Sequence, residues 1–293
     1  MPWPFLLSIK AQIRRRLPHW VILIREHRRM HGEFPRIIRP VTFSEMILRR
    51  NLFDRRSLLT CIADKVAVRS YVESRLGLGI LPQLYHVTAR PETIPFDTLP
   101  DRFVVKPTHG SGWYLVVTDK SALDRVALIK TCSGWLNRSY YQETGEIVYK
   151  HIQPRILVEQ FIDDGSGAPA SDYKLFVFRG RVEFIYVVTD RLTDHKRRLY
   201  TPAWEKLAVR IESEEVEGGV PPPPHLAEMI AAAETLGRDW DFIRVDLYDT
   251  PDQPYFGELT MTPGGGRYRF HPKEYDRYLG TLWRRRQRGT NEP

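Results

Sequence analysis

Two stretches of the chain contain residues whose types and spacing suit chemistry on a phosphate group. The first is KPTHGSGW at residues 106–113, directly after the apolar run FVV. Lys106 leaves a predicted strand there just before Gly110 and Gly112, and backbone amides in such a glycine turn form a concave anion site. A lysine ammonium is a compact charge suited to phosphate oxygens. Taken alone, the pattern is more often an ordinary hairpin, and it lacks the residue order of the Walker loop.

The second stretch is a predicted hairpin that joins DFIRVDLY to YFGELTM. If its turn is centred on Asp252, Asp246 lies opposite Glu258 and Arg244 lies opposite Thr260. Because strand side chains alternate with a period of two, these four residues share one face of the hairpin. The other face is then apolar and consists of Val245, Leu247, Leu259 and Met261.

The opposed carboxylates of Asp246 and Glu258 need a cation nearby. Directly opposed Cβ atoms are about 5 Å apart, and two carboxylates at that separation repel by roughly 3 kcal/mol at an effective dielectric near 20. Arg244, a diagonal neighbour of Glu258, could neutralise one charge in an ordinary ion pair. A divalent ion could neutralise both, and oxygen ligands without a nearby His or Cys favour Mg²⁺ over zinc. The hairpin alone leaves both interpretations open.

Hydrophobic periodicity and turn residues predict the elements that position these stretches. Helices dominate the first part of the chain, and paired strands follow from about residue 100 onward. Arg179 and Gly180, between DYKLFVF and RVEFIYVVTD, give a strong hairpin signal. The expected helices span residues 5–30, 43–59, 62–77, 121–137 and 225–237. The expected strands before the last hairpin span residues 80–87, 103–107, 114–119, 156–162, 172–178 and 181–190.

Composition indicates a globular protein of two or three lobes. The 293 residues are 42% hydrophobic and 27% charged, and the chain is long enough to bury a substantial core. No apolar run approaches the roughly 20 residues of a membrane-spanning helix. The first residues also lack the order of a signal peptide, so we expect a cytoplasmic location. Cys61 and Cys132 are too few for a metal knuckle or a disulfide framework.

Positive charge is concentrated near the N-terminus. Residues 1–56 contain 13 Lys and Arg against four acids, a net charge of +9, whereas the whole chain carries +8. A nucleic-acid-binding protein would spread this charge over its working face, so no nucleic-acid partner is expected. The basic helical region is either an ordinary solvated face, which is the commoner case, or a surface that adsorbs to an anionic membrane.

Six motifs, taken in order, resemble the ATP-grasp superfamily and within it the TupA-like ATP-grasp family, which is named for a protein of teichuronopeptide synthesis. The similarity runs from about residue 40 to about residue 283. The motifs are DK at 64–65, FVVKPTHGSGW at 103–113, ILVEQFI at 156–162, DYKLF at 172–176, RVDLY at 244–248 and FGELTMTPGGG at 256–266.

The resemblance implies an α+β fold in which two α+β lobes with antiparallel sheets clamp ATP. The expected domains are a basic, mostly helical N-terminal region over residues 1–95, a lid lobe over 96–155 and a C-terminal lobe with the metal hairpin over 156–293. The implied cofactors are ATP and Mg²⁺.

The resemblance also implies roles for the residues around the nucleotide. Lys65 and Lys106 would reach the phosphates of ATP, and Glu159 would be the hinge acid near the adenine or ribose. The lid over the phosphates would be formed by His109, Gly110, Ser111 and Gly112. His109 could donate to a phosphate, although a loop histidine is as often a hydrogen-bonding turn residue.

Further roles fall on the C-terminal lobe. Asp172 and Lys174, at i and i+2 on one strand face, would line the nucleotide or acceptor site, with a surface ion pair as the alternative. Arg244 would lie beside the phosphates, so that Lys106, Lys174 and Arg244 are the expected catalytic residues. Asp246 and Glu258 would be ligands of Mg²⁺. Thr260 stands where the superfamily usually has asparagine, and its hydroxyl could hold the metal or a water on it.

The function that the resemblance implies is ligation of a carboxylate to an amine through an acylphosphate. The expected partners are an amino acid, such as glutamate, and a uronic acid in cell-surface polysaccharide synthesis. Asp190 and Arg191 could hold the acceptor carboxylate or form a salt bridge, and Arg267 and Arg269 could attract an anionic substrate. Three alternatives stay open, namely an ATP-grasp kinase, a nucleotide-sugar glycosyltransferase and a non-enzymatic basic adaptor.

Overall fold

The computed structural model describes residues 18–189, 196–211 and 219–284. The N-terminal helices are α2 (His19–His31), α3 (Phe43–Phe53), α4 (Ser57–Ala63) and α5 (Val68–Leu76). The next elements are β1 (Leu84–Thr88), η1 (Pro91–Thr93), η2 (Phe96–Thr98), β2 (Phe103–Pro107), β3 (Leu115–Val117), α6 (Arg125–Leu136), α7 (Tyr140–Thr144), η3 (Ile147–Tyr149) and β4 (Ile156–Gln160). The last elements are β5 (Asp172–Phe178), β6 (Arg181–Thr189), β7 (Lys196–Tyr200), β8 (Arg210–Ile211), α8 (Leu226–Gly237), β9 (Phe242–Asp249), β10 (Pro254–Thr260), η4 (Pro263–Gly266), β11 (Phe270–His271) and α9 (Glu274–Arg284).

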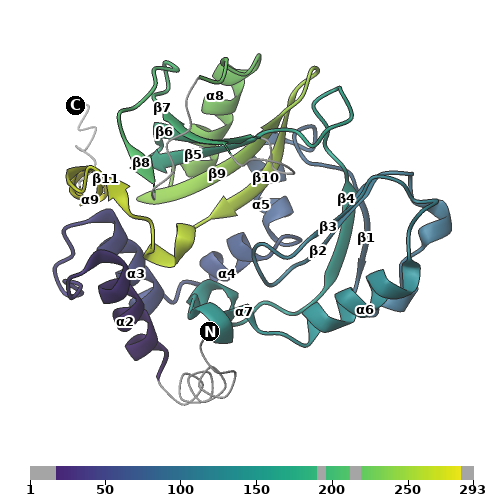
Figure 1. Cartoon of the computed structure of the whole chain (residues 1–293), viewed down its shortest axis with the longest axis horizontal. Helices are drawn as coiled ribbons and strands as arrows, with labels where there is room; N and C mark the ends of the chain where they lie inside the picture. The colour runs from purple at the N-terminus through teal and green to yellow at the C-terminus, as the bar shows by residue number, and fades with distance from the viewer. Residues whose placement is uncertain (1–17, 190–195, 212–218, 285–293) are drawn as a thin grey trace, which may run out of the picture.

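These strands form antiparallel sheets around which the helices pack. A four-stranded sheet has the order β1-β4-β2-β3, a five-stranded sheet has the order β10-β9-β5-β6-β7, and β11 pairs with β8. In Figure 1 the four-stranded sheet forms the right-hand lobe and the five-stranded sheet the upper left lobe. The expected α+β fold of two lobes with antiparallel sheets is therefore present. No described helix is long and apolar enough to cross a membrane.

The helix expected over residues 43–59 is two helices, α3 and α4. The break lies at Asp54, whose carboxylate accepts a hydrogen bond from the backbone amide of Arg56 at 3.2 Å and from its guanidinium at 2.5 Å. An aspartate that binds its neighbouring backbone amide competes with the helical hydrogen bond. The second helix therefore starts only at Ser57.

The helix expected over residues 62–77 also begins later than the periodicity indicates. Asp64 accepts hydrogen bonds from the amides of Val66 and Ala67 at 2.8 and 3.2 Å, and α5 starts at the next residue. Of the helix expected over residues 5–30, α2 accounts for the part from His19, and residues 1–17 lie outside the described residues.

The four-stranded sheet draws its strands from all three expected domains. β2 pairs with β3 as the sequence predicted, with Phe103 opposite Val117. β4 lies between β1 and β2 and bonds to both. The predicted boundaries at residues 95 and 155 therefore cut through one sheet, because β1 and β4 belong with β2 and β3.

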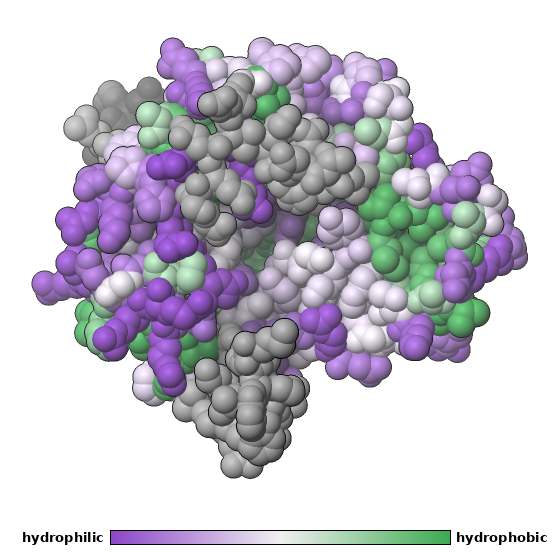
Figure 2. All heavy atoms as spheres, viewed as in Figure 1, coloured by the Kyte–Doolittle hydropathy of each residue, from purple (hydrophilic) through white to green (hydrophobic). Residues whose placement is uncertain are grey.

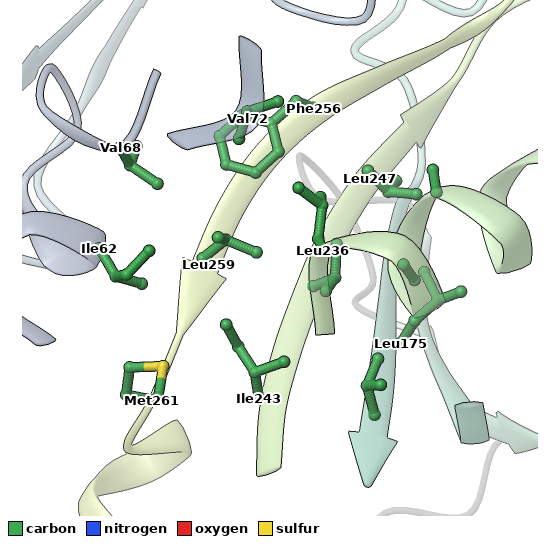
Figure 3. Packing of buried hydrophobic residues seen from close by; sticks show 14 of the residues in the cluster. Ile62, Val68, Val72, Leu175, Leu236, Ile243, Leu247, Phe256, Leu259 and Met261 are labelled. Carbon is green, nitrogen blue, oxygen red and sulfur yellow. The ribbon is translucent and has the colours of Figure 1, made fainter. Parts of the chain in front are cut away.

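The five-stranded sheet confirms the alternation predicted for its strands. Arg179 and Gly180 turn β5 into β6 with φ angles of 51° and 75°. One face of β9 and β10 points its apolar residues toward α8 and the helices α4 and α5, as Figure 3 shows for Leu247, Leu259 and Met261. These three side chains are at most 2% exposed. The core of the molecule thus lies on the face that the sequence marked as apolar.

The other face of the same sheet is aromatic at one end of the strands and charged at the other. At one end Phe176 and Phe242 pack around Phe43 of α3, and Trp283 of α9 stacks on Phe242 with ring centroids 4.9 Å apart. At the other end the same face carries charged side chains, including Lys174 opposite Asp246. The aromatic end packs against α3 and α9, and the charged end forms part of the candidate site.

The packing of α9 on the start of α3 generates a stability prediction. A Cβ at Gly280 would lie 2.0 Å from the carbonyl oxygen of Val41, which is backbone and has little room to move. Gly280→Ala should therefore lower the free energy of unfolding by about 2 kcal/mol in urea denaturation. The matched control is Gly134→Ala on α6, where nothing lies within 4 Å and the helix should gain about 1 kcal/mol. Equal stability of the two variants would contradict this packing.

Candidate active site

A cleft of about 330 Å³ is lined by residues of both large lobes. Strands β2, β3 and β4 contribute one wall, and β5, β9 and β10 contribute the other. Part of the lining is apolar and includes Val104, Val116, Phe161, Ile162 and Ala170. Most of the predicted site residues line the same cleft, and these are Lys65, Lys106, Ser111, Gly112, Glu159, Asp172, Lys174, Arg244, Asp246 and Glu258.

A row of charged residues crosses the large sheet at the floor of the cleft. Glu258 lies opposite Asp246, and Asp246 lies opposite Lys174 on the next strand. The predicted pairing of Asp246 with Glu258 and of Arg244 with Thr260 is thus confirmed. The register shifts between Phe256 and Glu258, and a Cβ on the intervening glycine would lie only 3.0 Å from the carbonyl oxygen of Asp246.

Asp246 is clamped by two cations. Its carboxylate accepts hydrogen bonds from the Arg244 guanidinium at 2.6 and 2.8 Å and from the Lys174 ammonium at 2.7 Å. Burial would raise the pKa of Asp246, but the charges of Arg244 and Lys174 hold that pKa below its ordinary value. Arg244 also donates to the hydroxyl of Thr260 at 2.9 Å. Arg244 therefore pairs with Asp246, not with Glu258 as the ion-pair interpretation of the sequence supposed.

Lys174 joins two buried acids. Its ammonium bonds to Asp172 as well as to Asp246. Burial would lower the pKa of Lys174, but the two carboxylates raise it above its ordinary value. Asp172 is 1% exposed, so the alternative of a surface ion pair does not describe this contact. Such a network is held together by mutual neutralisation, because an unpaired buried charge costs several kcal/mol.

The two lysines predicted to reach phosphates are engaged with the chain itself. Lys106 forms an ion pair with Glu159, whose charge raises the pKa of the lysine against the effect of burial. Lys65 donates to the carbonyl oxygen of Gly110, and burial lowers its pKa. The charges of Glu258 and Glu159 raise the pKa of Lys65, and the charge of Lys106 lowers it. An anion that enters the cleft would meet both ammonium groups together.

The glycine-rich loop lies over the cleft, but His109 faces away from it. Its ring is buried, and Nε2 lies 3.1 Å from the carbonyl oxygen of Trp135. Ser111, Gly112 and Trp113 reach the cleft from this loop. A Cβ at Gly110 would lie 2.8 Å from the ring of Trp113. The geometry gives His109 the contact of a structural turn residue, which was the alternative open from the sequence, and no contact with the cleft.

The carboxylates of the cleft suit Mg²⁺ in kind, because both Asp246 and Glu258 offer hard oxygen ligands. The carboxylate of Glu258 makes no hydrogen bond or direct ion pair with any described residue, and Glu258 lies opposite Asp246 in the sheet. The described residues hold no preformed group of three or more His, Cys, Asp or Glu for a metal. Since Arg244 and Lys174 already bind Asp246, the open ligand for a cation is Glu258.

A buried carboxyl that no motif indicated lies beside the site. Glu146 is 5% exposed and accepts a hydrogen bond from the hydroxyl of Thr262 at 2.7 Å. Burial raises the pKa of Glu146 to about 7. Burial also raises the pKa of Tyr140 to about 12, with further contributions from the charges of Glu146 and Glu258. The only sequence signal was an acid between a glycine and an apolar run in an irregular segment, which is too weak to single it out.

Comparison with known protein families gives a match over most of the chain. The model of the family described as TupA-like ATPgrasp matches residues 45–284. Among curated proteins, no sequence matches the chain. Asp190 and Arg191, considered from the sequence for the acceptor, lie outside the described residues.

Solved structures similar to this one include ligases. A D-alanine–D-alanine ligase from Bacillus anthracis complexed with ATP is 18% identical, with 71% of this chain and 56% of that chain covered and a TM-score of 0.42. An L-amino acid ligase from Bacillus licheniformis is 17% identical, with 82% and 55% covered and a TM-score of 0.46. This chain therefore spans little more than half the length of either protein.

The environment of Glu146 generates a pH prediction. Its pKa is about 7 in the folded protein against an ordinary value of 4.5. The contribution of protonated Glu146 to the free energy of unfolding is thus fully present below pH 4.5 and is lost as the pH rises through 7. Glu146→Gln removes this dependence, so the stability of the wild type relative to the variant should fall by about 2 kcal/mol between pH 5 and 8.

Urea denaturation of both proteins at the two pH values measures this difference. The exposed helical residue Glu228 provides the control, and Glu228→Gln should leave the pH profile unchanged. A parallel pH profile for wild type and Glu146→Gln would show that Glu146 titrates like a solvated acid.

Proposed function

The chain belongs to the TupA-like ATP-grasp family, and from this premise we propose that it is an ATP-dependent carboxylate–amine ligase. The observation that carries the proposal is the cleft, which combines an apolar wall, the ammonium groups of Lys65 and Lys106, and the opposed carboxylates of Asp246 and Glu258. These are the features that a base, a triphosphate and a magnesium ion each require.

ATP would bind along the cleft with its base against the apolar wall. Val104, Val116 and Phe161 form a surface for a flat ring, and Glu159 at the end of β4 lies where a ribose hydroxyl could bind. Lys65 and Lys106 then face the phosphates, and Ser111 and Gly112 cover them from the loop. Entry of the triphosphate would draw Lys106 away from Glu159 and Lys65 away from Gly110, the partners they hold now.

Glu258 and Asp246 would hold Mg²⁺, with the hydroxyl of Thr260 beside them. When bound, the ion would supply positive charge to the phosphate oxygens as charge develops on them. Arg244 and Lys174 fix the carboxylate of Asp246 at two points and add their own positive charge to the site. Their role is to position and to neutralise, which is where most of the catalysis of phosphoryl transfer resides.

The proposed reaction has two steps. An oxygen of the acceptor carboxylate attacks the γ-phosphorus of ATP, the bond to the bridging oxygen breaks, and ADP leaves with that oxygen. The amine then attacks the carbonyl carbon of the acylphosphate, phosphate departs, and the amine loses a proton as the amide forms. Both steps depend on holding the reactants in place and on stabilising negative charge, so the site needs no nucleophilic side chain.

For the substrates we propose a uronic acid carboxylate in a cell-surface polysaccharide, of the teichuronopeptide kind, and an amino acid such as glutamate. The family supports this choice, and Arg267, whose charge acts on Glu146 beside the site, provides a cation for an anionic substrate. The use of ATP supports work in the cytoplasm, at the inner face of the membrane where such polysaccharides are assembled. A kinase would differ in leaving the phosphate on its acceptor.

Two substitutions test the proposed site. Glu258→Gln removes the open carboxylate and Lys106→Met removes an ammonium group, and each should lower ATP turnover about 100-fold or more. The assay measures ADP and inorganic phosphate with glucuronate oligosaccharides and an amino acid mixture. Equal release of ADP and phosphate, only when both acceptors are present, is the result expected of the wild type.

The matched control variants make the same changes of charge at exposed positions outside the cleft. Glu73→Gln and Lys130→Met alter exposed residues and should leave turnover unchanged. Full activity in both Glu258→Gln and Lys106→Met would overturn the site, and ADP formation without phosphate release would replace the ligase with a kinase.

A further inference from the structure

The N-terminal helices present a strongly basic surface. Between residues 18 and 56, Glu33 is the one exposed acid. Glu45 is buried, and Glu26 and Asp54 are partly buried and paired with arginines. Figure 2 shows hydrophilic residues over much of the region of α2 and α3, with hydrophobic residues among them. The exposed arginines are Arg25, Arg28, Arg29, Arg36, Arg39, Arg49, Arg55 and Arg56.

The same surface exposes large apolar side chains. Ile38 is 89% exposed, Phe34 63%, Phe53 62% and Trp20 57%. In the described parts of the chain few other large apolar residues are so exposed. Scattered exposed apolar residues are ordinary, but Trp20 and Phe53 line one groove together with Arg55, and apolar side chains gathered beside arginines mark an interaction surface. We call residues 18–56 the basic N-terminal surface.

A groove of about 450 Å³ opens at this surface. Its polar lining includes Arg55 at the edge and Asn51, whose buried side-chain amide has no hydrogen-bond partner among the described residues. Arg28 follows Trp20 and Ile24 at a spacing of four residues, so it lies on the same side of α2. The apolar lining consists of Trp20, Leu23, Ile24, Ile37, Leu52, Phe53 and Ile147.

We propose that the basic N-terminal surface binds an anionic membrane, with the arginines at the lipid head groups and Trp20 and Phe53 among the upper acyl chains. Charge alone would suit any polyanion. The apolar groove and the exposed aromatic rings favour a membrane, because a polyanion such as heparin has no apolar group to cover them, whereas the boundary between head groups and acyl chains accepts both charged and apolar side chains. The inference stands on this surface and is independent of the ligase chemistry.

The groove also lies next to the candidate active site along the chain. Tyr141, Gly145 and Ile147 line it, while Glu146 from the same segment bonds to Thr262 on the side of the site. Binding at the groove would therefore bring the segment that borders the site to the membrane. If the proposed function holds, this arrangement suits an acceptor glycan carried on a lipid.

Vesicle co-sedimentation of the full chain tests the surface. The protein should sediment with phosphatidylcholine vesicles that contain phosphatidylglycerol and not with phosphatidylcholine alone, and added salt should weaken the binding. Arg28→Gln/Arg55→Gln and Trp20→Ser/Phe53→Ser should each weaken it about tenfold or more. The matched control is Arg125→Gln/Val126→Ser on α6, an exposed basic and apolar pair outside the surface, which should change nothing.

Three results would overturn the proposal. One is absence of binding to the anionic vesicles, and another is binding that both surface variants leave unchanged. The third is a combination of two observations, namely tight heparin binding that the arginine variant loses and vesicle binding that Trp20→Ser/Phe53→Ser does not weaken. The surface would then recognise polyanions by charge alone. Circular dichroism and ATP binding, expected to be unchanged in all variants, exclude misfolding as a cause.

Discussion

The structure depends on one constraint, which is the burial of several charges on a single face of the five-stranded sheet. The opposite face of β9 and β10 is the main core, so their register cannot shift without moving charges into it. Asp246 is stable there only because Arg244 and Lys174 neutralise it, and removal of one partner of such a pair costs about 3–5 kcal/mol. The same neutralisation fixes the floor of the cleft, where the proposed phosphoryl transfer requires precise positioning.

Within that network Glu258 differs from its neighbours. Asp246 and Asp172 bond directly to cations of the chain, whereas the carboxylate of Glu258 forms no direct ion pair with a described residue and interacts with Lys65, Lys106 and Arg244 only at longer range. Lys106 and Lys65 are engaged with Glu159 and with the carbonyl oxygen of Gly110. Binding of a magnesium–triphosphate complex would satisfy Glu258 and offer both lysines new partners. The cleft is therefore neutralised enough to fold and still holds groups that a nucleotide can use.

Sequence reasoning located the strands and the charged row because period-two alternation is a local property. It placed Asp246 opposite Glu258, and it found the turn at Arg179 and Gly180. It did not find the helix breaks at Asp54 and Asp64, since a side chain that binds its neighbouring amides leaves no mark in hydrophobic periodicity. The partners of Arg244, the direction of His109 and the burial of Glu146 depend on tertiary contacts with residues distant in the chain. The boundaries expected at residues 95 and 155 divide the strands of one sheet, because β4 lies between β1 and β2.

The central claim is that this cleft activates a carboxylate with ATP, and oxygen transfer tests it most directly. Glucuronate oligosaccharides labelled with oxygen-18 in their carboxylates would be incubated with the protein, Mg²⁺, ATP and an amino acid mixture, and the phosphate followed by phosphorus NMR. We expect inorganic phosphate that carries one labelled oxygen, because that oxygen bridges carbon and phosphorus in the acylphosphate and leaves with phosphorus. Unlabelled phosphate, or a phosphoryl group that stays on a sugar hydroxyl, would contradict it.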